Sequence, residues 1–155
     1  GLQLPQRDPG HGRPERPPGR LHDGVEHELA GAVRYTQYSL MVFGHARIPI
    51  ISWMQAQAQE SLAHATQAGE EVTTIGGQVS LGIGELVGTH HASIDDIMKE
   101  LVAHERQGVT LYEALLGLVE GKSVSLEEYA RGMIRAEKLH TAEILKMLNK
   151  RAGDD

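Results

Sequence analysis

Four glutamates and two histidines of this chain lie at spacings that place them on the apolar faces of predicted helices. Following each helix in steps of three and four residues puts one glutamate on every inward stripe and a histidine on two of them. A buried carboxylate is costly unless it is neutralised, paired or bound to a metal. Carboxylate and imidazole donors that converge at one level suit a pair of divalent cations such as iron. The six candidate ligands are Glu28, Glu60, His64, Glu105, Glu137 and His140.

The two glutamate–histidine pairs differ in spacing. Glu137 and His140 are three residues apart, nearly one helical turn, so both donors point at one place. Glu60 and His64 are four residues apart, which is still one helical face, although a local π-bulge could absorb the difference. Tyr35 lies on the same helical stripe as Glu28. It is either a residue of the site or an ordinary core tyrosine.

Helices must position these residues, and four helical segments have recognisable ends. Asp23 with Glu26, and Ser125 with Glu128, have the spacing of capping boxes. Glycines or short polar linkers follow the segments. The predicted helices span residues 23–45, 49–76, 93–121 and 125–150.

Loop lengths predict the topology. Short connections within the first and second helix pairs indicate two antiparallel hairpins. The Gly-rich segment 77–92 is long enough to cross the bundle. The fold class is therefore all-α, a ferritin-like four-helix bundle of two hairpins joined by one long crossover. We expect residues 1–21 to form a Pro/Arg-rich extension, residues 22–150 the bundle, and residues 151–155 a short tail.

Composition excludes several other classes of protein. The chain has no cysteine, which removes disulfides, thiolate nucleophiles and iron–sulfur clusters. A net charge of −6 argues against a nucleic-acid partner, and no apolar run is long enough to predict a membrane span. The N-terminus lacks the apolar stretch of a secretory signal, so we expect a cytoplasmic protein.

The segment from Glu28 to Tyr35, Glu-Leu-Ala-Gly-Ala-Val-Arg-Tyr, resembles the first helix of bacterioferritins, and the resemblance extends over about residues 22–148. It implies that Glu28 and His64 bind one iron and that Glu105 and His140 bind the other. Glu60 and Glu137 would bridge the two ions, with Tyr35 hydrogen-bonded beside them. It also implies oxidation of Fe(II) by dioxygen or peroxide, and storage of ferric mineral inside a 24-subunit shell.

Three departures from the bacterioferritin pattern change these expectations. Glu60 precedes His64 by four residues, where the family has three, so the bridging geometry can change. Ser61 or Leu62 stands where the family has its haem-ligating methionine, so haem is not expected. Only 15 residues follow His140, too few for the fifth helix of the cage contacts. We therefore expect a homodimer along the first two helices in place of a 24-subunit cage.

Three functions fit the pattern. The first is a ferroxidase of iron homeostasis that binds two iron ions per chain, for which manganese or zinc could substitute. The second is a di-metal peroxide-scavenging or oxygen-activating oxidoreductase, with Gly108 opening space beside Glu105. The third is a metal-free helical interaction module. His104 points about 100° away from the stripe of its neighbour Glu105 and is expected outside the ligand set.

Overall fold

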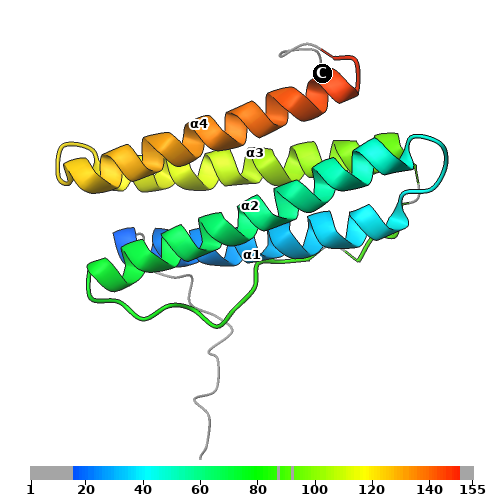
Figure 1. Cartoon of the computed structure of the whole chain (residues 1–155). Helices are drawn as coiled ribbons and strands as arrows, with labels where there is room; N and C mark the ends of the chain where they lie inside the picture. Colours follow the sequence, from blue (N-terminus) through cyan, green and yellow to red (C-terminus); the bar gives the residue numbers. More distant parts are fainter. Residues whose placement is uncertain (1–15, 87, 92, 151–155) are drawn as a thin grey trace, which may run out of the picture.

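The protein is a bundle of four helices, seen here in a computed structural model that describes residues 16–86, 88–91 and 93–150 (Figure 1). Helices α1 and α2 form one hairpin, and α3 and α4 form the other. No strand occurs among these residues, so the prediction of an all-α four-helix bundle is confirmed. The bounds are α1 Pro17–Met41, α2 Arg47–Thr74, α3 Ile94–Val119 and α4 Val124–Met147.

Helix ends follow the local chemistry of the chain. Ser123 caps α4, its hydroxyl accepting a hydrogen bond from the backbone N–H of Leu126. The first helix begins at Pro17, ahead of the expected Asp23. Proline is favoured there because its fixed φ suits a helix and the first turn needs no N–H partner. Most of the expected 1–21 extension lies outside the described residues.

The crossover between the hairpins lies against α1. The N–H of Gly84 donates to the carbonyl of Glu26 over 2.8 Å, and the guanidinium of Arg34 donates to the carbonyl of Glu85 over 3.1 Å. A β-carbon on Gly84 would lie 2.8 Å from the Glu26 carbonyl oxygen. Glycine is therefore required for this close approach of backbone to helix.

Two apolar clusters fill the interior. One contains Tyr35, Met54, Ile97, Leu101 and Ile144. The other contains Leu21, Val25, Val72, Tyr112, Leu115 and Met133. The predicted ligands fall between these clusters along every helix, so a polar layer is enclosed by apolar packing at both ends. Among the described residues, none of the helices combines the length and apolar composition that crossing a membrane requires.

Candidate metal centre

Three carboxylates from different helices meet in the middle of the bundle. Glu28 on α1, Glu105 on α3 and Glu137 on α4 are all buried. Two groups of three residues bring ligand atoms within 4.8 Å of one another: Glu28, His64 and Glu137, and Glu105, Glu137 and His140. Glu137 belongs to both groups. The geometry therefore offers two adjacent cation positions with one shared carboxylate.

The two histidines face these carboxylates through their Nδ1 atoms. Nδ1 of His64 lies 3.7 Å from Oε2 of Glu28 and 4.0 Å from Oε1 of Glu137. Nδ1 of His140 lies 3.6 Å from Oε2 of Glu105. The imidazole rings are nearly parallel, with centroids 6.2 Å apart. Each cation position therefore has one imidazole, one carboxylate of its own and a share of Glu137.

Glu60 takes a different place from the other glutamates. Its Oε1 lies 3.1 Å from Nε2 of His140 and 3.6 Å from Nε2 of His64, on the far side of both rings from the buried carboxylates. Its side chain is 41% exposed. Helix α2 continues through this region as an uninterrupted α-helix, with no π-bulge to turn Glu60 inward. Glu60 therefore lies at the rim of the centre, outside both groups of three.

Buried tyrosines hold two of the carboxylates. The hydroxyl of Tyr35 donates to Oε1 of Glu105 over 2.5 Å, and the hydroxyl of Tyr112 donates to Oε1 of Glu28 over 3.0 Å. Each bond crosses between α1 and α3. Tyr35 thus contacts the centre as a site residue would. Tyr112, which was not a predicted site residue, has the same relation to the other cation position.

The charges of the centre depend strongly on one another. Burial and the neighbouring carboxylates of Glu105 and Glu28 raise the pKa of Glu137 far above its usual value. Burial also acts to raise the pKa of Glu105, but hydrogen bonds from Glu137, His140 and Tyr35 outweigh it and lower that pKa to about 2. Without a cation, therefore, Glu137 keeps a proton between two ionised carboxylates. The proton on Glu137 reduces the repulsion between the three carboxylates, as a bound cation would.

A repeat within the sequence explains the symmetry of the centre. The pattern His-Glu-x-x-Gly-x-x-x-Tyr occurs at 27–35 and again at 104–112, an offset of 77 residues (27 to 104). The same offset relates Glu60 to Glu137. It also relates the first residues of corresponding helices, Pro17 of α1 to Ile94 of α3 and Arg47 of α2 to Val124 of α4. An internal comparison of the sequence finds this repeat. It would have identified Tyr112 and the pair His27 and His104.

His104 lies outside the two ligand groups, on the side of α3 that packs on α1. Its ring stacks on that of His27, with centroids 4.1 Å apart and planes 8° apart. Burial lowers the pKa of both imidazoles, that of His104 to about 4. The space expected beside Gly108 is filled, because a β-carbon there would lie 2.8 Å from Nε2 of His27 and 3.3 Å from Oε2 of Glu137.

A cavity leads to the centre from the side of α2 and α4. It has a volume of about 390 Å³, and His64 lines it together with polar and apolar side chains of both helices. Three of its lining residues are carboxylates: Glu70, Glu71 and Glu128. Acidic walls in a partly enclosed cavity concentrate cations. The cavity is therefore suited to guide a divalent cation toward His64.

The family comparison and the comparison with solved structures agree on the fold of this chain. Residues 19–152 match the family described as ferritin-like domain. The structure is similar to Dps from Listeria monocytogenes, with a TM-score of 0.79 and 18% identity over 88% of this chain and 95% of that one. It is also similar to a ferritin-like diiron-carboxylate protein from Bacillus anthracis, with a TM-score of 0.74 and 19% identity over 85% and 97%.

A third similar structure is the bacterioferritin-related dodecameric thioferritin of Bacteroides fragilis, with a TM-score of 0.76 and 16% identity over 86% of this chain and 84% of that chain. At these identities, the structural likeness describes the fold. No curated protein matches the chain in sequence.

Proposed function

The chain belongs to the ferritin-like domain family, and from that premise we propose that it is a bacterioferritin-like ferroxidase, which binds two Fe(II) ions per chain and oxidises them to Fe(III). The observation that carries the proposal is the shared position of Glu137, within 4.8 Å of two separate ligand groups. Burying a carboxylate between two histidine–carboxylate pairs costs desolvation energy, so it is unfavourable as simple core packing. The same carboxylate is well placed to bridge two cations.

In this proposal the two halves of the centre have matching roles. Glu28 and His64 bind one Fe(II), and Glu105 and His140 bind the other. Glu137 bridges them, releasing its proton as the cations enter. Glu60 accepts a hydrogen bond from Nε2–H of His140 over 3.1 Å and so directs Nδ1 of that ring at its metal position, while its Oε1 lies 3.6 Å from Nε2 of His64.

The proposed reaction takes one electron from each Fe(II). Dioxygen accepts both electrons with two protons to give hydrogen peroxide, or hydrogen peroxide accepts both with two protons to give water. The tyrosine hydroxyls keep Glu105 and Glu28 oriented, and the apolar clusters on either side exclude bulk solvent. Mn(II) and Zn(II) suit the same donors and would compete for the site.

The proposal includes a homodimer along α1, α2 and the crossover. Large apolar side chains are exposed mainly on these elements: Val33, Leu40, Phe43, Ile48, Leu62, Ile75, Val79, Leu81, Ile83 and Leu86. On α3 and α4, the large exposed apolar residues among those described are Val124, Leu139 and Met147. Large apolar side chains left exposed on the same part of the fold favour contact with a second copy of the chain.

The decisive experiment is an anaerobic Fe(II) titration followed by exposure to air, with the near-ultraviolet absorption of Fe(III) as the signal. We expect saturation at two irons per chain and rapid oxidation, both lost in Glu137→Ala. Glu143→Ala, an exposed glutamate of the same helix, is the matched control. Oxidation no faster than in buffer would reject the proposal. Stoichiometric binding without oxidation would favour another di-metal enzyme, and absence of binding a metal-free helical module.

A further inference from the structure

The few aromatic side chains of this protein gather at the centre. The chain has only one tryptophan, four tyrosines and one phenylalanine. Four of these six form two edge-to-face pairs. The ring centroids of Tyr112 and Tyr129 are 6.2 Å apart, and those of Tyr35 and Trp53 are 5.9 Å apart. One tyrosine of each pair donates a hydrogen bond to a buried carboxylate of the centre. Side chains that can lose one electron therefore lie in series from each cation position.

The pair of Tyr112 and Tyr129 joins the centre to the acidic cavity between α2 and α4. Tyr112 is 1% exposed and donates to Oε1 of Glu28 over 3.0 Å. The ring of Tyr129 is half-buried and lines the cavity together with Glu71. The hydroxyl of Tyr129 is buried without a hydrogen-bond partner among the described residues, an unusual state for a phenol. The packing of the bundle therefore gives no reason for this hydroxyl.

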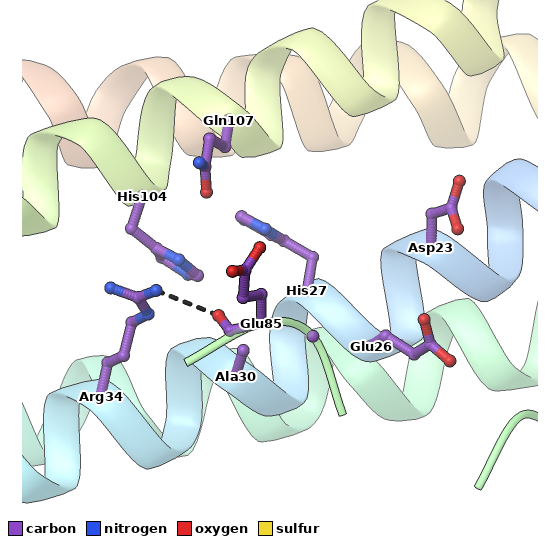
Figure 2. Close-up of a pocket in the computed structure, with 9 residues that line it drawn as sticks. Asp23, Glu26, His27, Ala30, Arg34, Glu85, His104 and Gln107 are labelled. Atoms are coloured by element: carbon purple, nitrogen blue, oxygen red, sulfur yellow. Dashed lines mark hydrogen bonds between the residues drawn. The ribbon is translucent and has the colours of Figure 1, made fainter. Parts of the chain in front are cut away.

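A corresponding series is absent between α1 and α3. Figure 2 shows the rings of His27 and His104 side by side there, with Glu85 reaching toward them from the crossover. The described residues that line this cavity include no tyrosine and no tryptophan. Imidazole and carboxylate groups are much harder to oxidise by one electron than a phenol. Electrons therefore reach the centre more easily from the side of α2 and α4.

We propose that Tyr112 and Tyr129 form an electron relay, which lets a centre that holds a single Fe(II) reduce hydrogen peroxide completely to water. The inference rests on the proposed function. One electron comes from Fe(II), and the second comes from Tyr129 by way of Tyr112. The O–O bond breaks, and Fe(II), Tyr129, hydrogen peroxide and one proton give Fe(III), a neutral radical of Tyr129 and two water molecules. Without the second electron, the same cleavage would release a hydroxyl radical.

The protons follow the same path. Tyr112 passes its phenolic proton along the hydrogen bond to Glu28 and on to the peroxide oxygen, and Tyr129 then restores Tyr112 by giving it one electron and one proton. Burial raises the pKa of both hydroxyls, so the tyrosines stay protonated until they are oxidised. A second Fe(II) in the acidic cavity, with a proton from solvent, reduces the radical and becomes Fe(III). Two Fe(II) ions are thus oxidised per peroxide even when they arrive one at a time.

The test is freeze-quench electron paramagnetic resonance of the whole chain, loaded anaerobically with one Fe(II) and mixed with one equivalent of hydrogen peroxide. We expect a tyrosyl radical in the wild type, with a signal that ring-deuterated tyrosine narrows. In Tyr129→Phe the radical yield should fall several-fold, and a spin trap should capture more hydroxyl radical. Tyr38→Phe, a buried tyrosine of α1 outside both pairs, is the control and should keep the wild-type yield. Tyr129→Phe should still bind two Co(II), which shows that the variant is folded.

A wild-type radical yield in Tyr129→Phe would overturn the inference, and so would a radical that is lost only in Tyr35→Phe. Oxidation of Fe(II) by peroxide no faster than in buffer would reject the proposed function and the relay with it. Rapid oxidation without a radical that depends on Tyr129 would reject the relay alone.

Discussion

Glu60 and Glu137 occupy equivalent positions in the two hairpins, 77 residues apart (60 to 137), yet only Glu137 lies inside the centre. The side chain of Glu137 is 2% exposed and that of Glu60 is 41% exposed. Each glutamate precedes a histidine, by three residues in α4 and by four in α2. One added residue rotates a helical position by about 100°. Because both histidines face the centre, the extra residue between Glu60 and His64 turns the side chain of Glu60 toward the rim of the centre.

This difference predicts unequal effects of two matched substitutions. Glu137→Ala should abolish binding of both cations, because it removes the shared carboxylate. Glu60→Ala should weaken binding by about tenfold to a hundredfold, as expected for a residue that orients ligands through hydrogen bonds. Anaerobic Fe(II) or Co(II) titration measures both. Equal losses in the two variants would show that Glu60 also binds metal directly.

The raised pKa of Glu137 makes the stability of the metal-free protein depend on pH. In the unfolded chain this carboxyl ionises near its usual pKa of about 4.3, whereas in the folded protein it keeps its proton. Its contribution to stability is complete below the unfolded pKa and declines as the pH rises above it, by up to about 1.4 kcal/mol per pH unit. Glu105, with its pKa lowered to about 2, instead contributes stability that is lost in strong acid.

Glu137→Gln should therefore stabilise the metal-free protein near neutral pH, since glutamine keeps the shape and a donor without ionising in the unfolded chain. The difference from wild type should grow from about pH 5 to 8 and disappear near pH 4. Urea unfolding of chelator-treated protein across this range measures it. A difference that does not change with pH would mean that Glu137 is already ionised in the folded protein.

Two glycines of α3 provide a paired test of packing at the centre. Gly108→Ala would bring a methyl group 2.8 Å from Nε2 of His27 and 3.3 Å from Oε2 of Glu137, so it should displace the shared carboxylate and impair metal binding. A β-carbon at Gly117 meets no atom within 4 Å. Gly117→Ala should leave binding intact and stabilise the helix by about 0.5–1 kcal/mol. Metal titration and thermal unfolding separate the two effects, and normal binding by Gly108→Ala would refute the packing argument.

Removing the hydroxyl of Tyr35 or of Tyr112 should weaken cation binding at opposite positions of the centre. Tyr35→Phe removes the hydrogen bond to Glu105 and should weaken the cation position of His140, whereas Tyr112→Phe should weaken that of His64. Losses of about tenfold to a hundredfold in affinity are expected. Stepwise Co(II) titration should show one weakened equivalent in each variant. Tyr38→Phe, a buried tyrosine of α1 outside the centre, serves as the control.

The proposed homodimer predicts that a charge on the apolar surface prevents association. Leu40→Glu, on an exposed part of α1, should convert a dimer to a monomer in light-scattering measurements, because the interface would bury an unpaired carboxylate. Leu139→Glu places the same charge on an exposed part of α4 and should leave the dimer unchanged. A monomeric wild type, or a Leu40→Glu dimer as stable as wild type, would exclude this interface.

The sequence by itself determined the four helices, the two hairpins and the buried stripes on which Glu28, Glu105 and Glu137 lie. Periodicity fixes these features because the angle between residues of one helix is set by its hydrogen bonding. The start of α3 at Ile94 lies within one residue of the predicted start at 93. The start of α1 differed from expectation because prolines favourable to a first turn precede the more obvious Asp23 signal.

Only the tertiary structure decided how the stripes meet. Periodicity within one helix does not set its rotation or height relative to its neighbours, which depend on how side chains of different helices pack. For this reason the sequence could not distinguish the shared Glu137 from the rim residue Glu60, or find the reciprocal bonds of Tyr35 and Tyr112. The close approach of His27 to Gly108 likewise depends on the distance between α1 and α3, which long-range packing alone determines.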